Sequence, residues 1–434
     1  MKQGKLLCFI LASTSIATAL TLCAEAPRQA PPVTQDHSQE KLQFVVIIAR
    51  HGVRSPTGKP DQWNQFSSQP WPVWSVPPGY LTEHGAKLMT LFGAYDRELL
   101  ANQGLLAAQG CGDVGRITIV ADSDERTRET GKAIAAGLMP GCKLETHALA
   151  EGTPDPLFHP LSMHTSQPDK QIATAALAGR IGNSLSGLVE AYRPQLRSLE
   201  EVLQDSGAPP KMSLFDIPSS IAPGKGDHLV DLKSPLATAA TMAENLLLEY
   251  TDGMAEVGWG RVDDHKLREL MQLHTASADL ERRTNYIARA QSATMLGRIL
   301  DSMQQAIRQK AISGALGQTS DRLLILVGHD TNLTNISGAL DLSWLIDGRR
   351  DDTPPGGSLT FELWQNDTTS NYTIRLFYTA QTLDQMRSAT PLSLATAPER
   401  VPVFIPGCSK ADVSCDWNVF QSVVHGAISS DVAR

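Results

Sequence analysis

The sequence lacks the motifs of several common hydrolase and nucleotide-binding mechanisms. It contains no G-x-S-x-G elbow, no HExxH pair and no C-x₂-C pair, which argues against a serine hydrolase, a zinc protease and a four-cysteine zinc site. The segment GVRSPTGKP at 52–60 has one residue too many for a P-loop, and Pro60 stands where Ser or Thr is needed. Cys111 is followed by an arginine at position 116, one position earlier than a cysteine-dependent phosphatase needs. We therefore expect neither a metal nor a cofactor.

The chain also lacks an excess of positive charge, and it has no long apolar run after residue 22. The net charge of −8 gives no electrostatic reason to expect nucleic acid as a partner. The apolar run at 6–22 follows two lysines and precedes the sequence AEA at 24–26, a pattern typical of a secretory signal peptide that spans residues 1–26. The alternatives are a lipoprotein anchor on Cys23, which Leu22 disfavours, and a retained membrane helix, for which the run is short. We expect a periplasmic or secreted protein with no membrane partner after cleavage.

Cysteine is scarce, and two of the six cysteines lie in the predicted signal peptide. The other four form two local pairs along the chain, Cys111 with Cys142 and Cys408 with Cys415. In an oxidising compartment, two local disulfides are the economical interpretation of this spacing.

The segment 44–57, FVVIIARHGVRSPT, joins an apolar run to a cluster of basic side chains. Phe44 to Ile48 is a β-branched run of the kind that forms a fully buried strand. It is followed at once by Arg50, His51 and Arg54. A buried strand ending in this cluster would bring two permanent cations and one nucleophilic imidazole into a crevice, which suits a phosphoryl group.

A second predicted strand, Ile117 to Ala121, is followed by an acidic turn and by a predicted helix at 126–138. Arg126 then stands at a strand-to-helix junction, where open α/β sheets place functional residues. The alternative is that Arg126 is a surface charge paired with Asp124 or Glu125.

A third predicted strand, Leu323 to Val327, is followed by His329 and Asp330. The alternative for these two residues is an ordinary turn in which Asp330 caps the next helix.

The remaining pattern predicts an α/β fold. Helical spacing at 82–104 indicates an amphipathic helix, and the segments 359–364 and 372–378 alternate as an antiparallel hairpin. We expect a mixed, mostly parallel sheet flanked by helices, built from both chain ends, residues 27–165 and 316–434.

The middle of the chain, residues 166–315, has long helical patterns, clearest at 234–250 and 278–312. It predicts an inserted, mainly helical subdomain.

Two segments lack such patterns. Residues 27–40 resemble a flexible lead-in, and residues 58–79, with three tryptophans and five prolines, predict an irregular surface segment whose tryptophans either cover the fold or face the substrate.

If the three predicted strands are parallel, their ends meet at one edge of the sheet. The resulting pocket would hold three arginines and two histidines: Arg50, Arg54, Arg126, His51 and His329. Guanidinium groups bind phosphate in a fork geometry. His51 could then attack phosphorus in line to form a phosphohistidine, and Asp330 could protonate the leaving alkoxide. Activity should peak below neutral pH, where the acid form of Asp330 is populated.

The motifs RHGVRSPT at 50–57, ADSDERTRETG at 121–131 and GHDTNL at 328–333 together resemble the histidine acid phosphatases. The match is closest to the bacterial periplasmic phytases of that family. Segments elsewhere are similar as well: PDPLFHPL at 154–161, GMAEVGWGRV at 253–262, PPGGSLTFELW at 354–364 and TLDQMR at 382–387.

The resemblance implies a role for each site residue. His51 would be the nucleophile and Asp330 the proton donor, and the phosphate would be bound by Arg50, Arg54, Arg126 and His329. Weaker substrate contacts are implied for Thr57, Lys59, Glu244 and Thr331. Phytases of this type often have lysine directly after this turn, whereas here Gly58 takes that place and Lys59 follows. The two cysteine pairs resemble family disulfides.

We therefore expect a monomeric, secreted histidine acid phosphatase that hydrolyses small phosphomonoesters, above all phytate (inositol hexakisphosphate), through a phosphohistidine. One alternative is a glucose-1-phosphatase-like or broad-specificity acid phosphatase. Another is a periplasmic protein that binds phosphate esters without turnover. The presence of both His51 and Asp330 argues against the latter, because binding alone needs the arginines but neither nucleophile nor acid.

Overall fold

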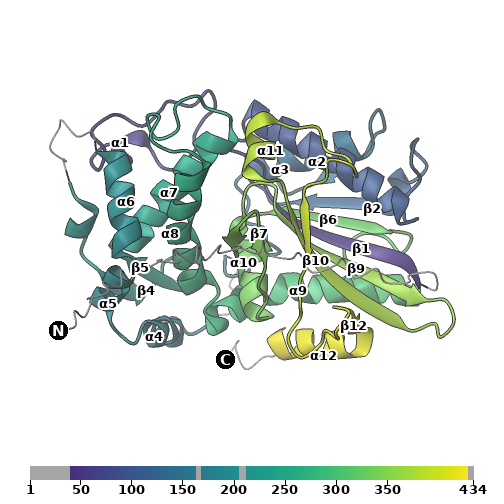
Figure 1. Cartoon of the computed structure of the whole chain (residues 1–434). Helices are drawn as coiled ribbons and strands as arrows, with labels where there is room; N and C mark the ends of the chain where they lie inside the picture. The colour runs from purple at the N-terminus through teal and green to yellow at the C-terminus, as the bar shows by residue number, and fades with distance from the viewer. Residues whose placement is uncertain (1–39, 163–167, 205–211, 429–434) are drawn as a thin grey trace, which may run out of the picture. The chain divides into compact units, whose positions relative to one another are not determined.

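The computed structural model describes residues 40–162, 168–204 and 212–428. An eight-stranded mixed sheet has the strand order β11-β10-β9-β1-β6-β2-β3, and β12 pairs with β10 (Figure 1). Its strands are β1 (Glu40–Arg50), β2 (Ile117–Ala121), β3 (Thr146–His147), β6 (Leu323–Gly328), β9 (Ser358–Asn366), β10 (Tyr372–Ala380), β11 (Glu399–Pro402) and β12 (Cys415–Asp416). The mixed α/β sheet predicted from the sequence is confirmed. The predicted signal peptide lies outside the described residues, as does the predicted lead-in except Glu40, which belongs to β1.

The centre of the sheet is parallel. β1 runs parallel to β6, with Val45 opposite Leu323 and Arg50 opposite Gly328, and β6 runs parallel to β2. On its other side β1 is antiparallel to β9, with a register shift between Leu42 and Phe44. The carboxyl ends of β1, β6 and β2 therefore lie at the same edge of the sheet.

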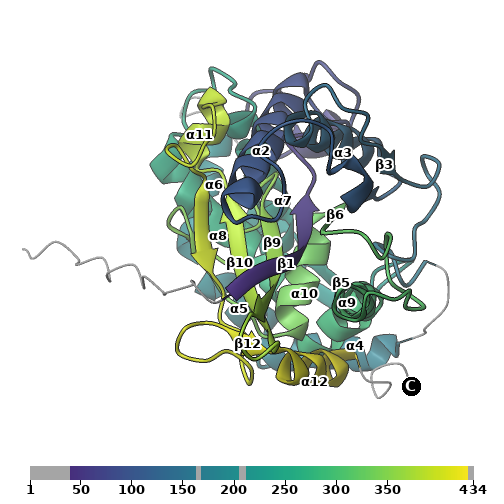
Figure 2. The ribbon, with the colours of Figure 1, turned by 90° about the vertical axis from the view of Figure 1, so that its right-hand side faces the viewer.

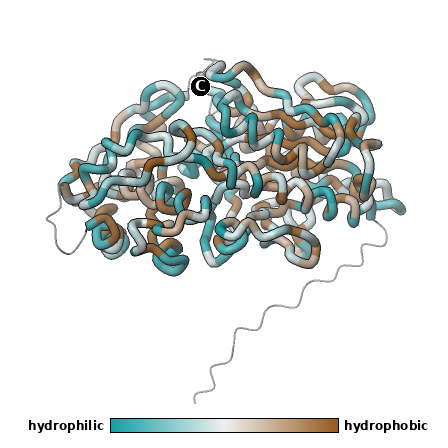
Figure 3. The backbone as a smooth tube through the Cα atoms, turned by 90° about the horizontal axis from the view of Figure 1, so that it is seen from above, coloured by the Kyte–Doolittle hydropathy of each residue, from teal (hydrophilic) through white to brown (hydrophobic). Residues whose placement is uncertain are grey.

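Strand β1 is buried on both faces because its side chains alternate between two hydrophobic clusters. Val46 and Ile48 pack with α9 (Asn285–Arg308), α10 (Asp330–Ala339) and α12 (Trp417–Ile428). Val45 and Ile47 pack with α2 (Glu83–Asn102) and α3 (Glu125–Leu138). Figure 2 shows α2 and α3 on one side of β1 and α10 and α12 on the other. Hydrophobic residues are concentrated in the part of the fold that contains the sheet (Figure 3).

Helices fill most of the region between β3 and β6. In addition to α9, they are α4 (Lys170–Arg180), α5 (Leu185–Ala191), α6 (Arg193–Leu203), α7 (Pro235–Thr251) and α8 (Asp264–Arg282), with a hairpin of β4 (Ser220–Pro223) and β5 (Val230–Lys233). The short elements elsewhere are α1 (Pro60–Trp63), α11 (Leu383–Ser388), β7 (Leu345–Ile346) and β8 (Arg349–Arg350). A single helix over 278–312 is wrong: α8 ends at Arg282, and α9 starts at Asn285. Thr284, between them, has a ψ of 117°, outside the helical range.

The apolar residues of α9 belong to the same cluster as the sheet. Met295, Ile299 and Met303 are buried against strands β1 and β6 and against α12. These residues, two methionines among them, are therefore part of the core. The division into domains at residues 166 and 315 stays a prediction.

Both expected disulfides, Cys111–Cys142 and Cys408–Cys415, are formed. In the parts of the chain that the structure describes, none of the helices is both long and apolar enough to cross a bilayer.

A buried carboxyl on α7 makes the stability of the fold depend on pH. Glu249 accepts a hydrogen bond from the Gly258 amide at 2.9 Å, and burial raises the pKa of Glu249 to about 7. The folded state therefore favours the protonated form, so stability is greatest below pH 4.5 and is lost as the pH rises through 7. We expect Glu249→Gln, which keeps the acceptor, to raise the free energy of unfolding by roughly 3 kcal/mol at pH 8.

Urea unfolding at pH 4 and pH 8 measures this difference. At pH 4 the substitution should change stability little, since Glu249 is then protonated in both states. An equal shift of the midpoint at the two pH values would contradict the assignment.

Candidate active site

The three predicted cationic segments meet at the carboxyl edge of the parallel strands. Arg50 is the last residue of β1, and the His51 amide donates to the Gly328 carbonyl at the end of β6 at 2.9 Å. The neighbouring segment after β2 leads into α3, which carries Arg126 in its first turn. The sequence thus places these residues together because parallel strands end at one edge.

His51 is almost completely buried and held in one tautomer. Its Nδ1 lies 2.8 Å from the Gly52 carbonyl oxygen. A carbonyl can only accept, so Nδ1 carries the proton and Nε2 keeps its lone pair. Burial, together with the positive charges of Arg126 and Arg50, holds the pKa of His51 well below its ordinary value. The imidazole therefore stays neutral and nucleophilic at acidic pH.

Arg50 and Arg54 share the carboxylate of Glu244 on α7. Arg50 donates through Nη2 to Glu244 and through Nη1 to the Thr353 carbonyl at 2.5 Å. Arg54 Nη2 lies 3.6 Å from the same Glu244 oxygen. Burial lowers the pKa of Arg54 to about 10, so both guanidiniums stay charged at acidic and neutral pH. Glu244 thus holds the two arginines in place. This role goes beyond the weak substrate contact that the resemblance implies for Glu244.

Arg126 faces the same site while it is paired with an acid. Its Nη2 lies 2.5 Å from Asp124 Oδ2 and 3.4 Å from His329 Nδ1. The alternative drawn from the sequence, an ion pair with Asp124, is therefore present. It does not remove Arg126 from the site, because the same guanidinium group reaches His329.

His329 is one of two imidazoles that share the carboxylate of Asp122. The Nε2 atoms of His329 and His159 lie 2.6 and 2.8 Å from the same oxygen, Oδ2. Burial would raise the pKa of Asp122, but the two hydrogen bonds outweigh it and hold that pKa below its usual range. Asp122 and His159 were not among the predicted site residues, although they lie in the segments ADSDERTRETG and PDPLFHPL.

These three side chains are the residue types that bind transition metals, and their ligand atoms lie within 4.8 Å of one another. Ligands about 2.1 Å from a tetrahedral zinc ion lie roughly 3.4 Å apart. The separations of 2.6 and 2.8 Å to one oxygen are those of hydrogen bonds. We therefore interpret the group as a hydrogen-bonded triad that orients His329.

Asp330 is the first residue of α10, and its carboxylate forms an ion pair with Arg282 at the end of α8. Burial alone would raise the pKa of Asp330. The charges of Arg282, Arg50 and His274 outweigh burial and hold it well below its usual range. Arg282 and His274 were not predicted, because α8, on which both lie, carries no local motif.

A cavity of about 340 Å³ opens beside this cluster and is lined by Arg54, Glu244 and Asp330. Its other walls come from α7 and α8: Ala237, Ala240, Thr241, His274, Ser277, Ala278, Glu281 and Arg282. Three residues predicted as weaker substrate contacts, Thr57, Lys59 and Thr331, do not line it, and Thr57 and Lys59 are exposed.

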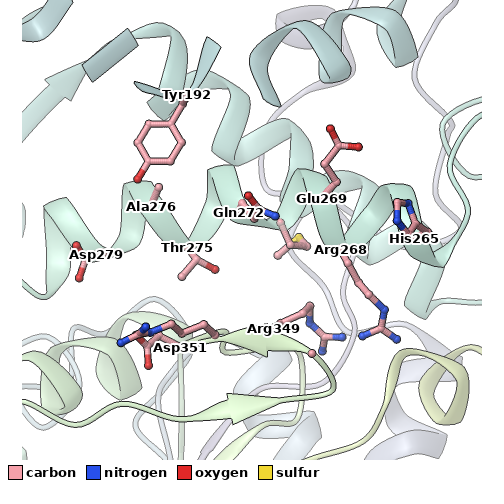
Figure 4. Close-up of a pocket in the computed structure, with 13 residues that line it drawn as sticks. Tyr192, His265, Arg268, Glu269, Gln272, Thr275, Ala276, Asp279, Arg349 and Asp351 are labelled. Carbon is pink, nitrogen blue, oxygen red and sulfur yellow. The ribbon is translucent and has the colours of Figure 1, made fainter. Parts of the chain in front are cut away.

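Two further cavities lie nearby. One of about 710 Å³ lies on another face of α8, where Arg268 and Arg349 approach each other (Figure 4). None of the predicted site residues lines it. The other, of about 210 Å³, is lined by Trp63, Trp71 and Trp74 of the irregular segment. Trp71 is also buried in the hydrophobic cluster of the helical region, which favours the covering role for that tryptophan.

Comparison with known proteins assigns the chain to a family. The model of the histidine phosphatase superfamily (branch 2) matches residues 41–205 and 241–379. The phytase AppA of Escherichia coli is 38% identical over 91% of this chain and 93% of its own length. A glucose-1-phosphatase of Providencia rettgeri is 29% identical over 94% of this chain and 98% of its own.

Solved structures agree with this assignment. The apo phytase of Hafnia alvei superposes with a TM-score of 0.85 at 33% identity, covering 92% of this chain and 99% of that one. The same enzyme in complex with myo-inositol hexakis sulphate gives a TM-score of 0.83, again at 33% identity, with the same coverage of both chains. The chain is therefore a member of branch 2 of the histidine phosphatase superfamily and a phosphomonoester hydrolase.

Proposed function

We propose that this protein is a phytase that hydrolyses inositol hexakisphosphate through a phosphohistidine on His51. The observation that carries the proposal is the position of the His51 imidazole, with its Nε2 lone pair among the guanidiniums of Arg50, Arg54 and Arg126. Such an arrangement both binds a phosphoryl group and presents a nucleophile to it.

The first chemical step follows from these positions. His51 Nε2 forms a bond to phosphorus while the bond from phosphorus to the leaving oxygen breaks. The arginines and His329 stabilise the charge on the other phosphoryl oxygens. Asp330 gives its proton to the leaving alkoxide. Water then attacks the phosphohistidine with Asp330 as base, which returns free His51 and releases phosphate.

We favour phytate over smaller phosphate esters as the substrate for two reasons. The phytase of Escherichia coli is more similar in sequence than the glucose-1-phosphatase of Providencia rettgeri, 38% against 29%. In addition, a phytase structure with a hexasulphate analogue of inositol superposes over 92% of this chain. The cavity wall also carries the guanidinium of Arg282, which suits a substrate with several anionic groups.

Phosphate release from phytate and from glucose 1-phosphate at mildly acidic pH tests the substrate assignment. We expect kcat/KM to be at least about tenfold higher for phytate, with no loss of rate in a chelator. The reverse preference would keep the chemistry but make the protein a sugar phosphatase. Binding of either ester without release would support the phosphate-ester binding protein instead.

We also propose that the protein acts in the periplasm or outside the cell; its monomeric state stays a prediction. The supporting observations are the sequence pattern of residues 1–26 and the two disulfides, which form and persist in oxidising compartments.

A further inference from the structure

Arg282 occupies an unusual position, because it is paired with the group that must donate a proton. Its Nη1 contacts Asp330 Oδ2, and Asp330 is its one hydrogen-bond partner among the described residues. The Arg282 side chain is 30% exposed and that of Asp330 15%. Both line the 340 Å³ cavity, so a substrate in the cavity reaches the pair directly.

This ion pair conflicts with the reaction. A general acid has to carry a proton when the leaving oxygen departs. A guanidinium against a carboxylate favours the ionised form, and among the cations that lower the pKa of Asp330, Arg282 has the largest effect. The enzyme therefore needs a step that separates Arg282 from Asp330.

Other groups near Asp330 do not provide that step, since they are fixed by partners of their own. Arg50 is held by Glu244 and Thr353, and His274 lies 3.4 Å from Glu244. The charged and titratable groups that face Asp330 are Arg50 and Arg54 from β1 and its loop, Glu244 from α7, His274 and Arg282 from α8, and Tyr378 from β10.

Arg282 has fewer partners than its neighbour Arg283. The cavity that Arg282 lines also has the small side chains of Ala237, Ala240 and Thr241 in its wall. Arg283, by contrast, is fixed by Asp351 Oδ2 at 2.7 Å and by the Leu342 carbonyl at 2.6 Å. The two adjacent arginines thus form a natural pair of test and control positions.

We propose that Arg282 selects substrates with a second phosphate beside the one being cleaved: that second phosphate takes the guanidinium away from Asp330, so that Asp330 can be protonated and act as the acid. This inference rests on the proposed function, since phytate carries neighbouring phosphates and glucose 1-phosphate does not. With a lone phosphate, Arg282 stays on Asp330, and proton donation is impaired.

The test compares Arg282→Gln with wild type on phytate and on glucose 1-phosphate across pH. We expect the ratio of kcat/KM for phytate to that for glucose 1-phosphate to fall at least about tenfold, mainly through a higher KM for phytate. In the wild type, kcat for glucose 1-phosphate should decline at a lower pH than kcat for phytate. In the variant the two declines should coincide, because the one for glucose 1-phosphate moves upward.

Arg283→Gln, as the control, should leave both the ratio and the two pH profiles unchanged. Arg282→Lys, which keeps the charge, should retain most of the preference for phytate. An equal loss on both substrates with unmoved pH profiles would mean a structural role and would overturn the inference. If wild type releases no phosphate from phytate, the proposed function fails. The upward shift with glucose 1-phosphate still tests whether Arg282 controls Asp330.

Discussion

The variant His51→Ala should lose about four orders of magnitude or more in kcat. The reason is that the His51 imidazole keeps a free Nε2 lone pair, whereas the ring nitrogens of His329 are engaged by Asp122 and Arg126. Without a nucleophile the arginines can still bind phosphate esters, but the phosphorus has no protein atom to bond to. Rapid mixing with substrate followed by acid-free isolation should trap a phosphohistidine in wild type and none in the variant.

A binding measurement distinguishes loss of the nucleophile in His51→Ala from misfolding of the variant. Inositol hexasulphate should still bind to His51→Ala with an affinity near that of wild type, because Arg50, Arg54 and Arg126 are unchanged. Residual turnover above a hundredth of the wild-type kcat would place the nucleophile elsewhere.

The second large effect is a loss of kcat in Asp330→Asn, and its size depends on whether the leaving group needs a proton. Asp330→Asn should lower kcat for phytate by about 10²- to 10⁴-fold, because the inositol alkoxide is a poor leaving group that needs a proton. For p-nitrophenyl phosphate the loss should be much smaller, since nitrophenolate leaves without protonation. Steady-state kinetics on the two substrates measure the difference.

A matched change nearby checks that the effect is chemical. Ala339→Ser alters the last residue of α10, which does not line the cavity, and should change the two rates little and to the same degree. If Asp330→Asn slowed both substrates equally, Asp330 would be a binding or structural group and the acid would have to be sought elsewhere.

The sequence predicts well that the proposed reacting groups lie together, because they follow strands. A buried strand is visible as a short β-branched run, and what comes directly after it lies at the sheet edge. Arg50, His51 and Asp330 could therefore be placed together before any coordinates were known. The disulfide pairs were also predictable, and so was the helix expected at 82–104 from its apolar spacing. In the structure it spans Glu83–Asn102, and Thr82 caps its start by accepting from the Gly85 amide.

The residues that surround the reacting groups could not be predicted in the same way. Arg282 and His274 lie on α8, more than 200 residues from His51 in the chain, and their distance from the site depends on how helices pack. The boundary between α8 and α9 was missed for a related reason. Leu280 and Ile287 keep a seven-residue apolar spacing across the break, so periodicity alone continues through it.

One departure from the phytase pattern has a steric explanation. Gly58 stands where related phytases often have lysine, and a Cβ atom there would lie 2.8 Å from Trp63 Nε1. The tryptophan of α1 therefore occupies the space that a longer side chain at position 58 would need. A lysine could be restored only together with a smaller residue at position 63.

The alternation of the β1 side chains between two hydrophobic clusters also limits which insertions and deletions the gene tolerates. Inserting or deleting one codon between Phe44 and Arg50 would exchange the two sets of core side chains and turn His51 toward the opposite face. The shift in pairing between Leu42 and Phe44 is a place where an extra residue is already absorbed. Insertions and deletions should therefore be tolerated at the amino-terminal end of β1, up to residue 43. In the seven codons that follow, 44–50, selection should remove them.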